Sequence, residues 1–582
     1  MNLFNSKLIS RLTLTLSCVL PVFAVLHPAR SAERIGMSYS FLSGSIPISS
    51  LETYARTGRI DSKWADYTSR INSKQLAQLQ QLLSTKIPLN SVAVSQFLHT
   101  PIGKKLLERL GQVIKTDGHV SEFHALREAM ILAARNPQGF MPLEVLRQFP
   151  SKTVYIKLEE ALALVGDVNQ FVNQTHDASM IVNQKAMLEA QETQFPFDLS
   201  RSENLRQPGR LAWQKQTLTL SDPERDRQIP TDLYLPRSRT RHPIVIISHG
   251  LGSDRFSFAY LAEHLASHGF AVVVPQHSGS DSNQLAALLA GRVRDITSPQ
   301  EFVNRPIDVS KLLDKLEQLS RFNSDLQERL DLQNVGIVGQ SFGGYTALAV
   351  AGATLQAQHL KTVCQASQNS LNLSLLLQCG ATQLPQLPSH LSDPRIKAAI
   401  AINPFSSAIF GQAGLSQIRV PTMIVASSAD AIAPALPEQI QPFTWLTTPN
   451  KYLALMTGAT HFSALASSPN EAVPVPPFVV GTNHAFVSQY INALNIIFFK
   501  TYLMNQQQYR SYLNADYVSQ FPMQLALVKT LSTSDLSKNL EDKLSLTLRA
   551  FCFYLFVLLN HHKINMSHKY YDFKSSGNKV CC

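Results

Sequence analysis

The stretch that decides the fold is residues 334–344, which read Asn-Val-Gly-Ile-Val-Gly-Gln-Ser-Phe-Gly-Gly. An apolar run rich in valine and isoleucine ends in Gly339-x-Ser341-x-Gly343, and residues 345–353 have the composition of a helix. Glycines flank the serine because the turn that carries it is too tight for side chains there. The G-x-S-x-G pattern alone is a weak signal, but between a strand and a helix it indicates a nucleophile elbow. The stretch therefore predicts a catalytic serine at position 341.

Short apolar runs on both sides of this stretch alternate with helical segments. The runs are residues 244–248, 271–275, 335–338, 398–402, 422–426 and 452–456, and candidate strands 211–220 and 229–235 flank a turn at 221–223. This alternation predicts a parallel sheet covered by helices on both faces, and hence an α/β domain over residues 201–530. Residues 354–394 are longer than an ordinary connection, so we interpret them as an inserted cap.

An acid and a base follow two of these strands. A serine nucleophile requires a base that accepts its proton and an acid that holds the base in one tautomer. Asp430 follows the run 422–426, and His461 follows the run 452–456. Both lie past the carboxyl end of a strand, where sites on open α/β sheets assemble, and they give the chain order Ser, Asp, His. We predict a triad of Ser341, Asp430 and His461.

Two backbone N–H groups should stabilise the oxyanion of the reaction. One is that of Phe342, the residue after the serine. The other is expected in the loop after an early strand, where His249-Gly250-Leu251-Gly252 makes Leu251 the expected donor.

Other acids compete with Asp430, because a loop aspartate after a strand is often a turn former or a helix cap. Asp281 precedes the serine, against the usual order, and Asp308 stands where a helix is expected to start.

Other bases compete with His461. His249 is better explained as part of the oxyanion-loop turn, and His277 follows a strand without a set role. Cys364 is a poor nucleophile because no elbow surrounds it. Ser341 could also stand in an ordinary glycine turn, but the acid and the base that follow it in the expected order would then be a coincidence.

Three phrases in the same order carry a resemblance to a known family. They are residues 247–252 (Ile-Ser-His-Gly-Leu-Gly), 265–270 (Leu-Ala-Ser-His-Gly-Phe) and 339–344 (Gly-Gln-Ser-Phe-Gly-Gly). Residues 211–500 resemble the α/β-hydrolase superfamily, nearest its platelet-activating-factor acetylhydrolase and dienelactone-hydrolase-like branch. The resemblance implies a serine esterase or lipase that cleaves short or medium acyl esters, or lipid esters, without a metal or organic cofactor. The cysteine-bearing insert and the end of the chain depart from the family pattern.

The region before this domain has a helical pattern. Segments 73–83, 101–114 and 158–172 carry apolar residues at three- and four-residue spacing, and no alternation indicates a sheet. We therefore expect an all-helical accessory domain over residues 33–200. This region resembles the uncharacterised domain joined to such hydrolases in cyanobacterial exported proteins.

The first 32 residues are typical of an export signal. Lys7 and Arg11 precede an apolar run at 12–26, and small residues at 28–32 predict cleavage near Ala32. An uncleaved anchor is the alternative. We expect a periplasmic or extracellular protein.

Export bears on the cysteines. In an oxidising compartment Cys364 and Cys379 would pair, and closing a loop of this size contributes about 3 kcal/mol; two free thiols are the alternative. His119 and His124 could be read as metal ligands, but solvated or packed helix histidines explain them better. We find no spacing typical of a metal site.

Residues 531–582 form a tail of unknown role. Its apolar stretch, residues 551–559, is too short to span a membrane. An amphipathic contact with a membrane surface is one interpretation, and a dispensable tail is the other.

Composition limits the function further. The chain has 582 residues, 45% hydrophobic and 16% charged, which indicates a globular protein of at least two domains. The net charge of +11 is not gathered into a basic stripe with aromatics, so we expect no nucleic-acid partner. The rivals to an esterase are a non-catalytic binding protein for envelope lipid or a partner, and an acyltransferase. The sequence leaves the oligomeric state open.

Overall fold

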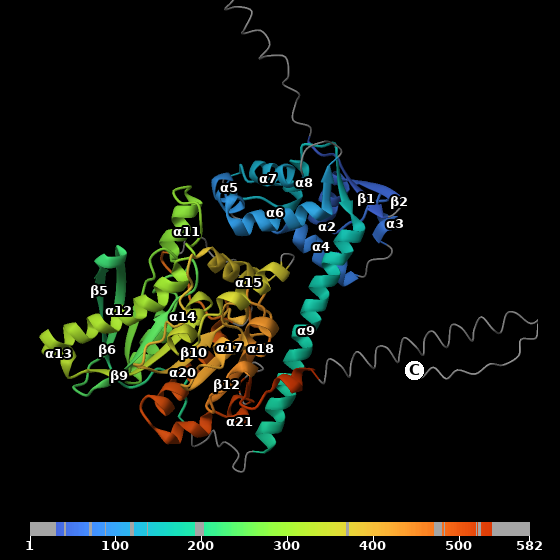
Figure 1. Cartoon of the computed structure of the whole chain (residues 1–582). Coiled ribbons are helices and arrows are strands. Elements are labelled where there is room, and N and C mark those ends of the chain that lie inside the picture. Colours follow the sequence, from blue (N-terminus) through green and yellow to red (C-terminus); the bar gives the residue numbers. More distant parts are fainter. Residues whose placement is uncertain are drawn as a thin grey trace, which may run out of the picture.

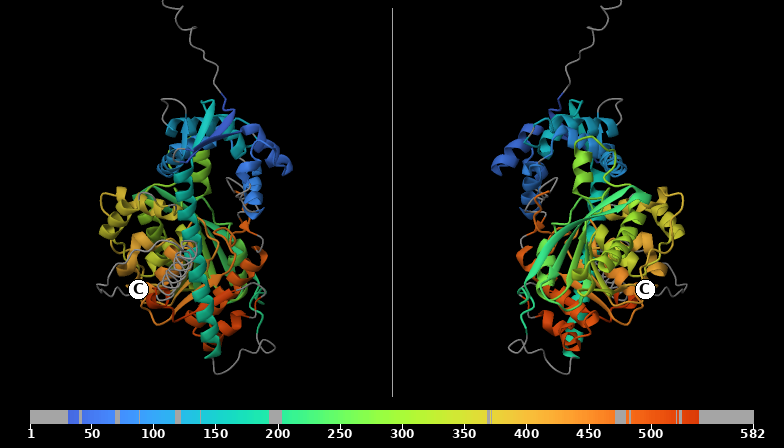
Figure 2. Two further views of the ribbon diagram at one scale, coloured as in Figure 1. Left: turned by 90° about the vertical axis from the view of Figure 1, so that its right-hand side faces the viewer. Right: turned by 90° about the vertical axis from the view of Figure 1, so that its left-hand side faces the viewer.

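The computed structural model describes residues 31–39, 42–68, 73–87, 89–116, 122–136, 138–192, 203–367, 370, 372–470, 480–481, 484–519, 521 and 525–537. The N-terminal unit (residues 31–157) and the larger unit (residues 203–537) are joined by one long helix, and the N-terminal unit lies at one end of the larger unit in each view (Figures 1 and 2). Residues 1–30 of the predicted signal and most of the C-terminal tail fall outside the described residues.

The larger unit is built on a nine-stranded sheet in the order β13-β12-β11-β10-β9-β7-β8-β6-β5. The strands are β5 (Trp213–Asp222), β6 (Arg227–Pro236), β7 (His242–Ser248), β8 (Ala271–Pro275), β9 (Leu330–Gln340), β10 (Ile396–Ile402), β11 (Thr422–Ser427), β12 (Lys451–Met456) and β13 (Leu525–Val528). The neighbouring strands β8, β7, β9, β10, β11 and β12 pair in parallel, while β5, β6 and β13 add antiparallel edges. The predicted α/β class is confirmed for this unit, and every apolar run predicted as a strand is one.

Helices cover both faces of the sheet. They are α10 (Ala259–Ser267), α11 (Ser282–Leu289), α12 (Glu301–Phe322), α13 (Ser324–Gln327), α14 (Phe342–Val350), α15 (Ala357–Ala366), α16 (Leu373–Gly380), α17 (Ser407–Leu415), α18 (Gln441–Trp445), α20 (His484–Tyr502) and α21 (Ala515–Ser519), with short helices η2 (Pro223–Arg225), η3 (Ala381–Gln383), η4 (Leu436–Ile440) and η5 (Gln507–Tyr512).

Strand β7 shows why its residues form a central strand. Ile244 and Ile246 belong to the core on the face covered by α12, α14 and α17, whereas Val245 and Ile247 belong to the core covered by α10 and α20. Successive side chains point to opposite faces, so a strand buried on both sides must be apolar at every position. Burial of each such side chain contributes about 1.5–3 kcal/mol.

The segment interpreted from the sequence as a cap contains two helices. Helices α15 and α16 lie within residues 354–394, and the predicted disulfide between Cys364 and Cys379 joins them, with the two Cα atoms 5.7 Å apart. Both helices pack on α17.

The prediction of an all-helical N-terminal domain is wrong. A four-stranded sheet, in the order β2-β1-β4-β3, accompanies its helices. The strands are β1 (Arg34–Tyr39), β2 (Leu42–Pro47), β3 (Ile114–Thr116) and β4 (Thr153–Lys157), and the helices are α2 (Ile48–Thr57), α3 (Ala65–Thr68), α4 (Ser73–Ser84), α5 (Ser91–His99), α6 (Pro101–Val113), α7 (Glu122–Ala133) and α8 (Pro142–Arg147). Strands of three to six residues are too short to show clear alternation, so the helical periodicity between them dominated the pattern.

Helix α9 (Leu158–Gln191) connects the two units. Its 34 residues give it a length of roughly 50 Å, and Figure 1 shows it running from the N-terminal unit along the side of the larger one. In its second half Ala178, Ile181, Val182 and Ala186 are buried in the core of the larger unit. The predicted boundary at residue 200 therefore falls after helix α9, which packs against both units.

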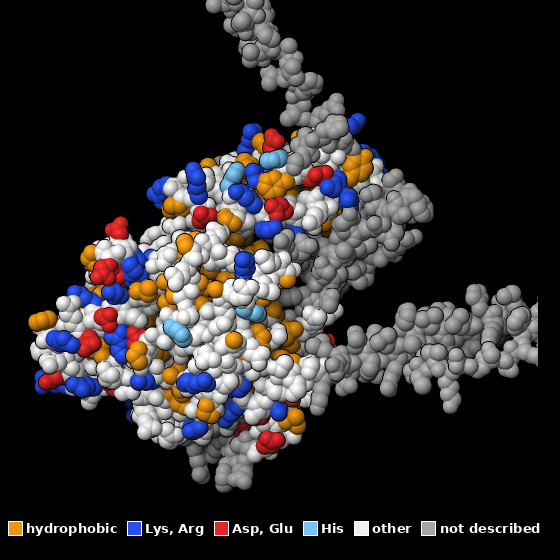
Figure 3. Space-filling view, in the orientation of Figure 1, with side chains coloured by type: hydrophobic (Ala, Val, Ile, Leu, Met, Phe, Trp, Pro, Cys, Tyr) orange, Lys and Arg blue, Asp and Glu red, His pale blue; other side chains and the backbone are white. Residues whose placement is uncertain are grey.

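Charged side chains are mixed over the surface. In Figure 3 Lys and Arg lie among acidic side chains on the visible face and form no continuous stripe. Within the described part of the chain, no helix combines the length and apolarity needed to cross a membrane.

Candidate functional site

Ser341 lies at a strained turn between β9 and α14. Its φ of 56° and ψ of −115° place a non-glycine residue in a region that L-residues rarely adopt. A Cβ atom at Gly339 would overlap the carbonyl oxygen of Gly343, and one at Gly343 would overlap the carbonyl oxygen of Ser248. The Ser341 N–H donates to the carbonyl of Ile402, 2.9 Å away, which ties the turn to β10. The glycines are thus required by close backbone packing around the serine.

Asp430 and His461 form a hydrogen-bonded pair. Nδ1 of His461 lies 2.7 Å from Oδ2 of Asp430, and both side chains are buried. The other carboxylate oxygen accepts from the N–H groups of Ile432 (2.9 Å) and Ala433 (2.8 Å), and Oδ2 also accepts from Nε2 of Gln439 (3.2 Å). A neutral imidazole that donates through Nδ1 has Nε2 as its acceptor. The pair therefore has the arrangement required of a general base and its orienting acid.

The backbone of His461 is fixed beside the serine. Its carbonyl accepts from Nε2 of Gln340 (3.1 Å), the last residue of β9, and from Nδ2 of Asn403 (3.3 Å), the residue after β10. Ser341 and His461 are both described, and no hydrogen bond joins their side chains in this structure. Catalytic hydrogen bonds are often long in enzymes without substrate and tighten when substrate binds.

The two predicted oxyanion donors come from the start of α14 and from the turn after β7. Phe342 is the first residue of α14, and the N–H groups of a helix's first turn have no acceptor within the helix. Leu251 lies in the turn after β7, where the N–H of Gly252 donates to the carbonyl of Ser280 (2.9 Å). A Cβ atom at Gly250 would overlap Oε1 of Gln340, so this loop, the oxyanion loop (residues 249–252), touches the strand that ends in the serine.

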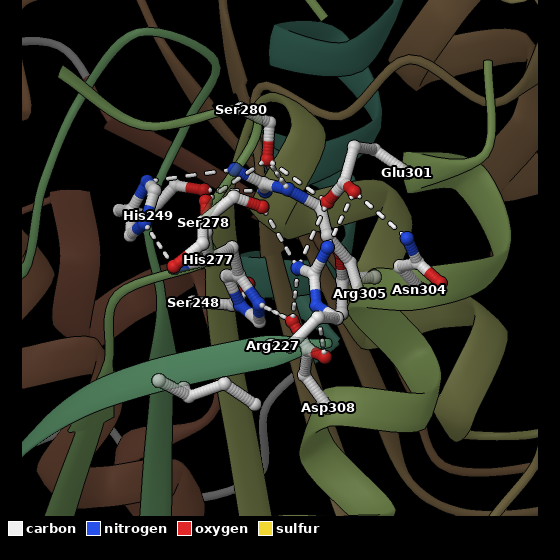
Figure 4. A network of polar contacts seen from close by, with 12 residues as sticks. Arg227, Ser248, His249, His277, Ser278, Ser280, Glu301, Asn304, Arg305 and Asp308 are labelled. Atoms are coloured by element: carbon white, nitrogen blue, oxygen red, sulfur yellow. Dashed lines mark hydrogen bonds and ion pairs between the residues drawn. The ribbon is translucent and has the colours of Figure 1, made fainter. Parts of the chain in front are cut away.

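Beneath the oxyanion loop lies a buried arginine that the sequence did not indicate (Figure 4). Arg305 is fully buried and donates to the carbonyls of His249 (2.7 Å) and Gly250 (3.4 Å) and to Oγ of Ser280 (2.8 Å). Its guanidinium carbon lies 4.4 Å from the centre of the Phe342 ring. Burial lowers the pKa of Arg305 to about 10, so it stays charged at neutral pH. One cation thus contacts both segments that carry the predicted oxyanion donors.

A second Ser–His–Asp chain lies in the same network (Figure 4). Oγ of Ser248 is 3.0 Å from Nε2 of His277, whose Nδ1 is 3.1 Å from Oδ2 of Asp308. All three side chains have no exposed surface, and Asp308 is ion-paired with Arg227. Ser248 ends a regular strand and has no elbow, so a substrate would not reach it. This chain supports the fold under the oxyanion loop.

The remaining alternatives also have structural partners. Oδ1 of Asp281 caps α11 through the N–H of Gln284, and Nε2 of His249 accepts from the N–H of His277. Cys364 is bonded to Cys379. His119 lies outside the described residues, and no group of three His, Cys, Asp or Glu side chains in the described ranges is placed to hold a metal ion.

Sequence comparisons relate three segments of the chain to known families. Residues 31–157 match a family described as alpha/beta hydrolase of unknown function (DUF1400). Residues 202–366 match the chlorophyllase family, and residues 384–519 match the PET hydrolase-like family.

Curated relatives are similar at low identity. Cutinase 2 of Thermobifida cellulosilytica is 26% identical over 233 residues, which cover 40% of this chain and 64% of the relative. Cutinase cut1 of Thermobifida fusca is also 26% identical, over 40% of this chain and 53% of the relative. The chain therefore matches less than two thirds of the length of these relatives.

Proposed function

Because the chain belongs to the α/β-hydrolase superfamily, we propose that it is an exported serine hydrolase that cleaves carboxylic esters through Ser341, His461 and Asp430. Two features together carry the proposal: a strained serine at an elbow and a buried, hydrogen-bonded Asp430–His461 pair. The elbow follows β9 and is bonded to β10, and the carbonyl of His461 accepts hydrogen bonds from residues at the ends of these two strands. The similarity to enzymes named cutinase, chlorophyllase and PET hydrolase-like supports an ester as the substrate.

The reaction follows from the positions of these groups. Nε2 of His461 accepts the hydroxyl proton of Ser341 as Oγ attacks the ester carbonyl, and Asp430 stabilises the imidazolium that forms. The N–H groups of Leu251 and Phe342 bind the oxyanion. His461 then donates its proton to the leaving alkoxide oxygen, which leaves an acyl-serine.

A second half-reaction releases the acid. His461 removes a proton from a water molecule, the resulting hydroxide attacks the acyl-serine, and the collapse of the second oxyanion returns the proton to Oγ of Ser341. The net change is one ester and one water converted to one acid and one alcohol.

Export is part of the proposal. The Cys364–Cys379 disulfide supports an oxidising compartment, because cytosolic thiols are kept reduced. Short or medium acyl esters, or lipid esters, are the proposed substrate class.

The test is a p-nitrophenyl ester series together with a fluorophosphonate probe. We expect wild type to hydrolyse at least one ester and to take up the probe, and Ser341→Ala to lose both while keeping its melting temperature. Ser511→Ala, at an exposed serine, is the matched control and should behave as wild type.

Other results would assign other functions. A folded wild type that neither hydrolyses esters nor reacts with the probe would favour the binding protein. Transfer of the acyl group to an added alcohol in preference to water would favour the acyltransferase.

A further inference from the structure

A small recess lies where the N-terminal unit meets the larger unit. Its cavity volume is about 90 Å³, less than the ~150 Å³ of a cavity that accommodates benzene. Three segments line it: the start of α6 with Pro101 and Ile102, residues 295–302 at and before the start of α12, and the cap helix α16 with Leu376 and Leu377. Among the described lining residues Asp295, which is exposed, is the one ionisable group. The recess suits a short alkyl group.

Elements that line the recess contact the candidate active site at two places. Phe302 forms part of its wall, and the ring centroid of Phe302 lies 5.0 Å from that of Phe342, the residue after the nucleophile. On the cap side, the N–H of Ser374 in α16 donates to the carbonyl of Ile432 (3.0 Å), whose own N–H donates to Asp430 (2.9 Å). The recess is thus separated from Phe342 by the Phe302 side chain, and it shares helix α16 with the contact to the acid loop.

The wall from the N-terminal unit is held in place. Helix α5 contacts α11, helix α6 contacts α16, and a Cβ atom at Gly291 would lie 3.0 Å from Nε2 of Gln96. Figures 1 and 2 show the N-terminal unit over this end of the larger unit. The start of α6 is fixed locally as well, because Oγ1 of Thr100 accepts from the N–H of Gly103 (3.1 Å) and Pro101 occupies the first helical position.

We propose that this recess is a subsite for a short alkyl chain of the ester substrate, and that the N-terminal unit supplies its outer wall through Pro101 and Ile102. The proposal rests on the proposed ester hydrolysis, because the chain must belong to a molecule held at Ser341. The alkyl chain is either the acyl group or the alcohol group of the ester, and the two have the same chemistry in an apolar recess. The N-terminal unit then determines which chain lengths are accepted.

The test varies the size of residue 102. Ile102→Phe should fill the recess and Ile102→Ala should enlarge it. Two substrate series separate the sources of the chain: p-nitrophenyl esters from acetate to octanoate, and acetate esters of alcohols from ethanol to octanol.

In the series whose chain occupies the recess, Ile102→Phe should lower kcat/KM for chains of four or more carbons by about 10-fold or more, since one methylene in an apolar pocket is worth at least this factor. The shortest ester should change by less than about two-fold. Ile102→Ala should shift the preferred length upward.

The controls separate the subsite from the fold and from the chemistry. Val92→Phe on α5, where the side chain is half exposed, should leave both length profiles unchanged. Leu377→Phe, on the opposite wall, should reproduce the effect of Ile102→Phe. If wild type hydrolyses esters but neither series responds to residues 102 and 377, the subsite is overturned while the proposed function stands. A wild type that is inactive on every ester overturns both.

Discussion

Arg305 donates from a fully buried position to the carbonyls of His249 and Gly250 and packs on the ring of Phe342. Arg305→Met would remove these donors, while Glu301 would keep its ion pair with Arg227. Because the oxyanion exists only in the transition state, we expect kcat to fall by about 100-fold or more with little change in KM.

The comparison variants make the role of Arg305 specific. Arg305→Lys keeps the charge but lacks the planar fork, so it should recover part of the lost kcat. Arg321→Met, at an exposed position of the same helix, should have wild-type kinetics. A loss of stability in Arg305→Met with kcat unchanged would assign this residue to folding alone.

Asp430 is the second residue whose chemistry can be tested directly. In Asp430→Asn an amide replaces the carboxylate that accepts from Nδ1 of His461, so the tautomer with Nε2 free is no longer favoured. We expect kcat to fall by about 10⁴-fold, as for the equivalent change in other triads. Initial rates across pH 6–9 measure it.

Asp281→Asn is the matched control for this change. Asp281 caps α11, and asparagine caps helices as well as aspartate does, so its activity should remain near that of wild type. Equal activity of the Asp430→Asn enzyme and wild type would exclude Asp430 as the acid.

At the scale of elements, the disulfide between α15 and α16 closes a loop of 15 residues. Replacing both cysteines with serine should lower the free energy of unfolding by up to about 3 kcal/mol through the entropy of the unfolded chain. Urea unfolding measures the loss. A reducing agent should lower the stability of wild type to that of the double variant and leave the double variant unaffected; an equal response of both proteins would contradict the prediction.

The elements that sequence alone predicted are those with a local signal. Strands β7 to β12 have central residues that are buried on both faces, so each contains a short apolar run. Strand β13 was missed because it is four residues long and pairs with β12, about 70 residues earlier in the chain. In the N-terminal unit, β4 (Thr-Val-Tyr-Ile-Lys) has five residues and β3 has three, too few for a clear alternation.

The candidate site divides in the same way. Ser341, Asp430 and His461 each follow a strand, and this placement made them visible in the sequence. Arg305 lies inside α12, more than 50 residues from the carbonyls that it binds, and Gln439 contacts Asp430 from a short helix after β11. No local pattern marks such residues, because their roles arise only when distant segments pack together.

For the whole molecule, buried histidines predict a stability that depends on pH. Burial lowers the pKa of His264 to about 4 and those of His249 and His277 well below the ordinary value of 6.5. Each is neutral in the fold, and in the unfolded chain each takes up a proton below about pH 6.5. The unfolded state therefore binds more protons as pH falls, and each histidine lowers the free energy of unfolding by up to about 1.4 kcal/mol per pH unit.

Above about pH 6.5 these histidines do not lower the free energy of unfolding; for His264 the loss of stability builds up between there and pH 4. Urea unfolding at pH 7.5, 6.0 and 5.0 measures the slope. His264→Gln keeps a donor for the carbonyl of Leu205. It should reduce the number of protons taken up on unfolding, which the slope reports, by up to one. The same slope in wild type and variant would show that His264 does not contribute.

Helix α9 links the folding of the two units, because it packs against both of them. The helix belongs to the N-terminal unit by chain order, yet four of its side chains fill the core of the larger unit, and its Glu189 accepts from the N–H groups of Lys529 and Thr530 near the far end of the fold. A gene shortened to start at residue 203 would encode a unit in which the apolar surface covered by α9 is exposed. Evolution and protein engineering are thus restricted to exchanging the two units together, or to cutting ahead of residue 158 and keeping the helix whole.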